Sequence, residues 1–185
     1  YVPVYDADGN MVFDEKANRV ANLLLQRGIK KGDKVAILMM NGLEWLPIYF
    51  GILKTGALAV PLNFRYSSDE ILYCVQLAEV DVLVFGPSFI GRVEEIADEI
   101  SKGRLLIYVG ENCPSFADDY NSLSANCSSQ APCIGITDDD DAAIYFSSGT
   151  TGFPKAILHK HKALMHSAQV EANHHGQQKD DVFLC

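Results

Sequence analysis

The residues best suited to chemistry lie in one polar stretch, residues 147–155, with the sequence SSGTTGFPK. Four hydroxyl side chains, two glycines and a lysine follow directly after the apolar run 142–146. Glycines let backbone N–H groups approach an anion, while hydroxyls add donors and can ligate magnesium. Lys155 adds a positive charge, and Pro154 fixes the backbone before it. The stretch therefore suits phosphate oxygens.

Two common nucleotide-binding patterns do not match this stretch. In a Walker A loop, GxxxxGK[ST], the lysine directly follows the second glycine and a Ser or Thr follows the lysine. Here Phe153 and Pro154 intervene, Ala156 follows Lys155, and the sequence contains no GxGxxG. An ordinary polar turn is the alternative on composition alone. We expect a helix over residues 159–173, and the order strand, loop, helix favours a phosphate loop.

The rest of the chain alternates between helical and strand patterns. Apolar spacing predicts helices over residues 14–28, 43–54, 68–79, 88–101 and 159–173, and strands over 35–40, 57–60, 81–85, 104–109 and 142–146. Asp14 can cap the first helix and Gly28 can end it. Such alternation implies right-handed crossovers. The predicted fold class is α/β, with alternating β-α units forming a mainly parallel sheet flanked by helices.

Two segments interrupt this rhythm. Residues 110–137 are rich in Ser, Asn, Cys and Pro, and we expect a long connecting loop. Residues 138–141 are four consecutive aspartates. Four adjacent carboxylates cannot all face one cation, so we interpret them as a solvated turn that leads into the next strand.

Composition and charge exclude several classes of protein. The 185 residues are 48% hydrophobic, with 24 acidic and 15 basic side chains and a net charge of −9. This argues against disorder and against nucleic-acid binding, which depends on clustered basic side chains. The five cysteines lack zinc spacing and are expected to be free thiols. The apolar run 45–53 is far shorter than the roughly 20 residues of a transmembrane helix, so we expect a soluble, cytoplasmic protein.

The strand and polar stretch together resemble the phosphate-loop signature of the adenylate-forming (AMP-binding) superfamily. That signature reads [ST][ST]G[ST][ST]Gx[PA]K, and residues 147–155 match it at every constrained position. Residues 19–24, 32–37, 41–45 and 56–63 resemble the N-terminal subdomain of acyl-CoA synthetases, and residues 157–161 resemble its V-x-x-[ST]-H continuation. Ala156 and Lys160 depart from the usual residues, outside the loop itself.

The resemblance implies an enzyme that joins a carboxylic acid, such as a fatty acid, to coenzyme A through an acyl-adenylate, with ATP and magnesium. It assigns nucleotide binding to Ser147, Ser148, Gly149, Thr150, Thr151, Gly152 and Lys155. Ser147 is the position of a magnesium-contacting hydroxyl. Lys155 would stabilise departing pyrophosphate or brace the loop, and His161 would be structural or help position the loop.

Aromatic residues near the second predicted helix have two interpretations. Trp45, Tyr49 and Phe50 could line an acyl pocket, but aromatics on the apolar face of a core helix usually pack. We therefore expect packing.

The chain begins with Tyr1 and ends on an apolar run, so we expect part of a longer protein. The expected organisation is a partial N-terminal AMP-binding domain: an α/β subdomain to residue 137, a strand and phosphate loop over 142–155, then a helix and truncated strand over 156–185. We expect this segment to lack the C-terminal domain of that superfamily. Two alternatives stay open, namely an adenylation domain that loads a carrier protein and a fragment without turnover. A homodimer is also compatible with the resemblance.

Overall fold

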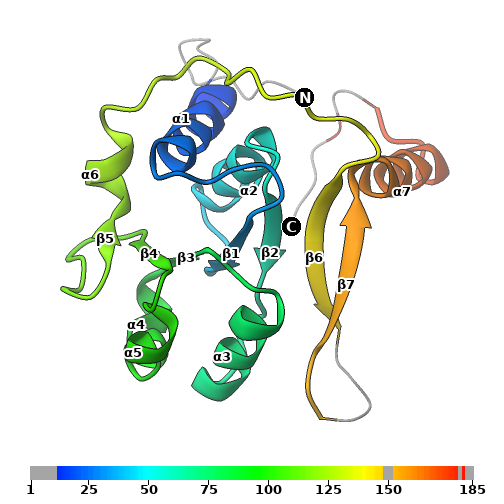
Figure 1. Ribbon diagram of the computed structural model, residues 1–185. Coiled ribbons are helices and arrows are strands. Elements are labelled where there is room, and N and C mark those ends of the chain that lie inside the picture. The colour runs from blue at the N-terminus through cyan, green and yellow to red at the C-terminus, as the bar shows by residue number, and fades with distance from the viewer. Residues whose placement is uncertain (1–11, 148–151, 179–180, 182–185) are drawn as a thin grey trace.

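Seven strands form one sheet in the order β5-β4-β3-β1-β2-β6-β7 (Figure 1). The computed structural model describes residues 12–147, 152–178 and 181. The strands are β1 (Lys34–Leu38), β2 (Leu58–Pro61), β3 (Val82–Phe85), β4 (Leu105–Tyr108), β5 (Asp118–Asp119), β6 (Asp141–Ser147) and β7 (Lys155–Lys160). All neighbouring pairs are parallel except β6 and β7, which are antiparallel. The predicted α/β class with a mainly parallel sheet is confirmed.

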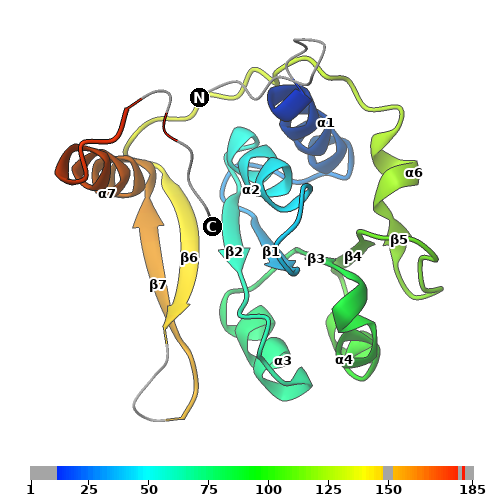
Figure 2. The same ribbon diagram turned by 180° about the vertical axis from the view of Figure 1, so that it is seen from behind.

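Helices cover both faces of the sheet, as the views from front and back show (Figures 1 and 2). The helices are α1 (Val12–Gln26), α2 (Trp45–Lys54), α3 (Ser68–Leu77), α4 (Ile90–Glu94), α5 (Ala97–Ile100), α6 (Tyr120–Ser124) and α7 (His161–His174). Helices α1 and α2 pack on one face with Val35 and Ile37 of β1. Helices α3, α4 and α5 pack on the other with Ala36 and Leu38. Because both faces are covered, β1 is apolar without alternation.

The two helices on the first face approach closely at a glycine. A Cβ added to Gly51 of α2 would lie 2.5 Å from Val20 Cβ and 2.8 Å from the Ala17 carbonyl oxygen of α1. No side chain fits at that separation, so this glycine is what lets the helix backbones meet. The expected packing role of the aromatic residues of α2 is also observed: the Trp45 and Tyr49 rings stack at 5.5 Å.

Helix α1 begins before the predicted cap. It starts at Val12, so Asp14 lies in its first turn instead of capping it. The Asp14 carboxylate accepts hydrogen bonds from Lys54 Nζ at 2.7 Å and from Asn18 Nδ2 at 3.1 Å. The side chain is thus used for a tertiary contact with α2. The predicted end is confirmed, because the helix stops before Gly28, which has a φ of +89°.

The single helix predicted over residues 88–101 is wrong. A short 3₁₀ turn (Pro87–Phe89) precedes α4, and a break separates α4 from α5. Phe89, Val93, Ile96 and Ile100 are all buried, at the spacing of one helical face. That spacing explains why the sequence predicts one helix. In the structure, short helical segments place these four side chains against the sheet.

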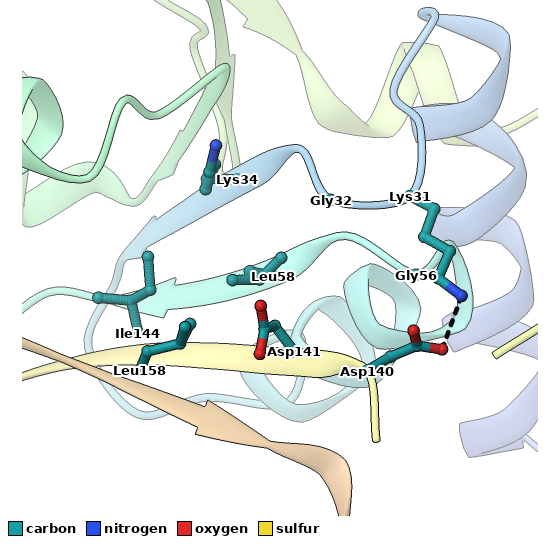
Figure 3. A pocket seen from close by; sticks show the side chains of 9 residues that line it. All are labelled: Lys31, Gly32, Lys34, Gly56, Leu58, Asp140, Asp141, Ile144 and Leu158. Atoms are coloured by element: carbon teal, nitrogen blue, oxygen red, sulfur yellow. Dashed lines mark hydrogen bonds and ion pairs between the residues drawn. The ribbon is translucent and has the colours of Figure 1, made fainter. Parts of the chain in front are cut away.

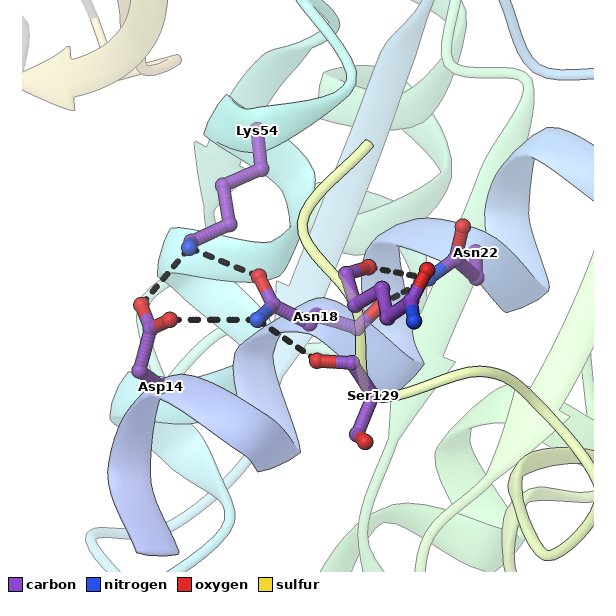
Figure 4. Close-up of polar contacts among 6 residues, drawn as sticks. Asp14, Asn18, Asn22, Lys54 and Ser129 are labelled. Carbon is purple, nitrogen blue, oxygen red and sulfur yellow. Dashed lines mark hydrogen bonds and ion pairs between the residues drawn. The ribbon is translucent and has the colours of Figure 1, made fainter. Parts of the chain in front are cut away.

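Residues 110–137 are more than a connecting loop. They form β5, which extends the sheet beside β4, and then α6, whose first turn is capped by Asp119 accepting from Ser122 N at 2.7 Å. Beyond α6 the chain runs across α1, as Figure 4 shows. Asn18 Nδ2 donates to the Ser129 carbonyl at 2.8 Å, and Asn22 Nδ2 donates to the Gln130 carbonyl at 2.9 Å. We call residues 127–137 the strap.

The helix predicted over residues 159–173 is wrong at its start. Residues 155–160 form β7, and the helix begins at His161. Pairing with β6 satisfies the backbone hydrogen-bonding groups of this segment. The phosphate-loop sequence therefore lies at the turn of a β-hairpin instead of between a strand and a helix.

The cysteines that the structure describes are free thiols, as expected. Cys74, Cys113, Cys127 and Cys133 are free, and Cys185 lies outside the described residues, as does the apolar run at 182–185. Over the part of the chain that the structure describes, no helix is long and apolar enough to cross a bilayer.

Candidate active site

The candidate site is built on the β6–β7 hairpin. Ser147 and Lys155 are directly opposed across the two strands, so they close the base of the loop. Opposed residues of an antiparallel pair project to the same face. Tyr145, two residues before Ser147, packs with the cluster under α1 and α2, and so the Ser147 and Lys155 side chains emerge on that face of the sheet. A hydroxyl and an ammonium group are thereby presented side by side.

The two ends of the loop are shaped differently. Gly152 has a φ of +98°, a conformation that favours glycine, and Pro154 behind it is buried. Lys155 is exposed and begins β7. The other predicted loop residues, Ser148, Gly149, Thr150 and Thr151, lie outside the described residues. The structure thus places Ser147, Gly152 and Lys155 of the predicted set.

A tyrosine pair supports the hairpin from α2. The hydroxyls of Tyr49 and Tyr145 are 2.7 Å apart and share a hydrogen bond. Burial and this hydrogen bond raise the pKa of Tyr49 above its ordinary value, so the group stays protonated. The Tyr145 ring also lies 5.1 Å from the His159 ring of β7. These contacts connect the core helix to both strands of the hairpin.

The acidic run anchors the other end of the hairpin. Its turn is formed by Asp140, which accepts from Thr137 N at 2.6 Å, and β6 begins at Asp141. The predicted turn and strand start is confirmed. The carbonyls of Asp138 and Asp140 also accept the N–H groups of Lys162 and His161 at 3.0 and 3.1 Å, so the run caps α7.

Charged partners fix this turn further. Lys31 Nζ contacts the Asp140 carboxylate at 2.6 Å, and the same amine donates to the Gly135 carbonyl at 2.8 Å. The hydrogen bond from Lys31, followed by that from the Thr137 backbone, lowers the pKa of Asp140 to about 2. Lys162 forms an ion pair with Asp139.

His161 is the first residue of α7, following Lys160 at the N-cap. Its Nε2 atom is buried and has no hydrogen-bond partner among the residues that the structure describes. The backbone N–H of His161 bonds to Asp140, which is a structural contact. The structural or positioning role of His161 stays a prediction.

Two hollows lie at opposite ends of the sheet. One, of about 380 Å³, is lined by residues that include Lys31, Asp140 and Leu158 and lies at the amino ends of β1, β2 and β6 (Figure 3). The other, of about 330 Å³, is lined by Asn41, Gly42, Trp45 and Leu46 and follows the carboxyl end of β1. Ligands of open α/β sheets bind outside the carboxyl ends of the strands. The second hollow and the phosphate loop share that end.

The described part of the chain holds no cluster of metal-binding side chains. Within residues 12–147 and 152–178, no group of three His, Cys, Asp or Glu side chains could hold a metal ion.

Sequence reasoning missed the residues that support the hairpin. Tyr49 and Tyr145 are 96 positions apart, and no spacing rule links them. The strand β7 had one local signal, the short apolar run 156–158 between Pro154 and the helix. That run could have indicated a strand.

Comparison with known proteins identifies the family. A model described as AMP-binding enzyme matches residues 12–185. The chain therefore belongs to the AMP-binding enzyme family, as its phosphate-loop sequence predicts.

Two relatives that are similar to this chain are both named as CoA ligases. The chain is 34% identical over 153 residues to long-chain-fatty-acid–CoA ligase FadD13 of Mycobacterium tuberculosis, covering 82% of this chain and 29% of the relative. It is 31% identical over 173 residues to 3-hydroxybenzoate–CoA/4-hydroxybenzoate–CoA ligase of Thauera aromatica, covering 91% and 32%. The chain spans about a third of the length of these curated relatives.

Solved structures share the fold. The anthranilate CoA ligase AuaEII in complex with anthranoyl-AMP superposes with a TM-score of 0.81 at 28% identity, covering 85% of this chain and 30% of that one. The inhibitor-bound N-terminal domain of FACL13 from Mycobacterium tuberculosis gives 0.77 at 28% identity, covering 87% and 39%. The α/β layers described above are thus those of N-terminal domains in this family.

Proposed function

We propose that the whole protein activates a carboxylic acid with ATP and transfers the acyl group to coenzyme A. The observation that supports this most is the pairing of Ser147 with Lys155 at the base of a loop that matches the family signature. The hairpin offers a hydroxyl and a cation on one face, which suits a triphosphate.

The chemistry makes a specific demand on such a loop. A carboxylate oxygen attacks the α-phosphorus of ATP, the α–β phosphoanhydride bond breaks, and pyrophosphate leaves with the negative charge. Groups that are held in place before the reaction stabilise that charge without reorganising. Lys155 would neutralise the departing pyrophosphate, and the Ser147 hydroxyl would contact the magnesium that accompanies ATP. Ser148, Gly149, Thr150, Thr151 and Gly152 would bind the phosphates.

The relatives favour coenzyme A over a carrier protein as the acceptor, because the two curated relatives described above are both named as CoA ligases. Their named acids differ, because one is named for long-chain fatty acids and the other for hydroxybenzoates. We propose a fatty acid as the substrate, a cytoplasmic location and a homodimer, with the isolated 185 residues inactive.

Isotope exchange between pyrophosphate and ATP tests the proposal on the whole protein. Exchange should depend on added carboxylic acid and magnesium, and a thioester should form when coenzyme A is supplied. Fatty acids of graded length and benzoates would rank the substrates. Failure of every acid to support exchange would overturn the proposal. If exchange occurs but the acyl group is transferred only to a phosphopantetheine carrier protein, that carrier is the acceptor and coenzyme A is not.

A further inference from the structure

We propose that Tyr73 of α3 is a positioning residue for the phosphate loop, acting through Phe153. The inference rests on the proposed function, because it concerns how the same loop is held for ATP. Phe153 occupies the one unconstrained position of the loop signature, so the signature itself assigns it no role.

The contact joins a core helix to the returning end of the loop. The rings of Tyr73 and Phe153 have centroids 4.8 Å apart and planes tilted by 41°. Phe153 is 54% exposed, so it is held mainly from one side. It lies directly between Gly152, with its positive φ, and the buried Pro154. An aromatic contact at this point limits where the backbone of Gly152 can go.

The residue before the loop packs on the same face of the sheet as Tyr73. Phe146, the last residue before Ser147, packs against the cluster under α3, and Tyr73 borders that cluster as well. Adjacent residues of a strand point to opposite faces. Aromatic rings thus flank the loop on the α3 side, while Ser147 and Lys155 emerge on the α2 side.

Helix α3 is a firm base for this contact. A capping box fixes its first turn: Ser67 N donates to the Glu70 carboxylate at 2.8 Å, and Ser67 Oγ accepts from Glu70 N at 3.3 Å. Ile71 and Val75, on either side of Tyr73, are fully buried. Because the helix is fixed, the Tyr73 ring can restrict the loop instead of moving with it.

A double-mutant cycle on the whole protein tests the proposal. Tyr73→Ala, Phe153→Ala and the double variant are compared in acid-dependent pyrophosphate exchange, with the Kd of ATP measured by calorimetry. Each single variant should raise the KM and Kd for ATP about 2- to 10-fold, the range expected from the coupling in one aromatic pair. kcat should change less than about twofold. The double variant should be no worse than the worse single variant.

Two further variants separate positioning from general stability. Tyr73→Phe keeps the ring and should restore the wild-type KM. Leu77→Ala removes a 48% exposed side chain from the last turn of the same helix, four residues beyond Tyr73, and should leave the KM for ATP unchanged. Should Tyr73→Ala fail to fold, Phe153→Ala decides the matter, because that exposed side chain can be removed with little loss of core.

The outcomes distinguish this inference from the proposed function. An unchanged KM and Kd in Phe153→Ala, or additive effects in the cycle, would overturn the role of Tyr73 while wild-type exchange still supports the ligase reaction. Wild-type protein that shows no exchange, yet binds ATP more tightly than the variants, would overturn the reaction and support the positioning role. Wild-type protein that does not bind ATP would overturn both.

Discussion

Ser147 and Lys155 are cross-strand partners at the end of the β6–β7 hairpin, eight positions apart in sequence and directly opposed in the structure. This pairing fixes their relative position more firmly than a loop alone could, because backbone hydrogen bonds of the ladder hold both residues.

Replacing Lys155 tests the charge that this arrangement supplies. Lys155→Ala should lower kcat for adenylation by about 100-fold or more in the whole protein, the size of loss expected when one preorganised charge-stabilising group is removed. The melting temperature of the Lys155→Ala variant should stay close to that of the wild type, because the Lys155 side chain is exposed. Lys160→Ala, an exposed lysine at the far end of the same strand, is the matched control. Equal rates in both variants would refute the assigned role.

The tyrosine pair predicts an asymmetry between two conservative changes. Tyr145→Phe leaves the hydroxyl of the buried Tyr49 unpaired and should cost about 1–3 kcal/mol of unfolding free energy. Tyr49→Phe leaves the hydroxyl of the half-buried Tyr145, which water can reach, and should cost less. The double variant should be more stable than Tyr145→Phe alone. Urea denaturation measures all three, and equal losses from the two single changes would contradict this account.

The strap should depend on Asn18 more than on Asn22. Asn18 is 3% exposed, donates to Ser129, and accepts from Lys54 at 2.7 Å. Asn18→Ala should lower the unfolding free energy by about 1–3 kcal/mol, because its half-buried partners lose their hydrogen bonds. Asn22→Ala removes bonds to exposed carbonyls, which water can replace, and should cost less. Hydrogen exchange of the strap amides would show whether the loss is local, and the reverse order of stability would count against the role of Asn18.

Acid should release the turn held by Asp140. Lys31 and Thr137 lower the pKa of this carboxyl from 3.8 to about 2 in the folded chain. A lowered pKa means that the carboxylate stabilises the fold above pH 4 and that this contribution is lost as the pH falls toward 2. The difference in urea midpoint between wild type and Asp140→Asn should therefore be constant from neutral pH to about pH 4 and disappear near pH 2. In a Lys31→Met background the difference should be smaller from neutral pH to about pH 4; an undiminished difference there would exclude Lys31 as the cause.

Local sequence patterns predicted the elements correctly where the pattern within one segment was enough to define its structure. The apolar run at β1 indicated a strand covered on both faces, and Gly28, at φ +89°, marked the end of α1. Local patterns gave wrong boundaries where packing against other elements decided the conformation. Residues 155–160 join β6 as a strand although a helix follows directly, and the helical spacing of Phe89, Val93, Ile96 and Ile100 is met by broken pieces.

The sequence by itself determined the α/β class, the family and the chemical character of the loop, because these depend on residue type, order and periodicity along the chain. Only the tertiary structure decided that the loop closes a hairpin, that Tyr49 meets Tyr145, and that Tyr73 meets Phe153. The two tyrosine contacts join residues that are far apart in sequence, and the hairpin depends on strand pairing. They arise from the packing of helices on both faces of the sheet, which no local pattern specifies.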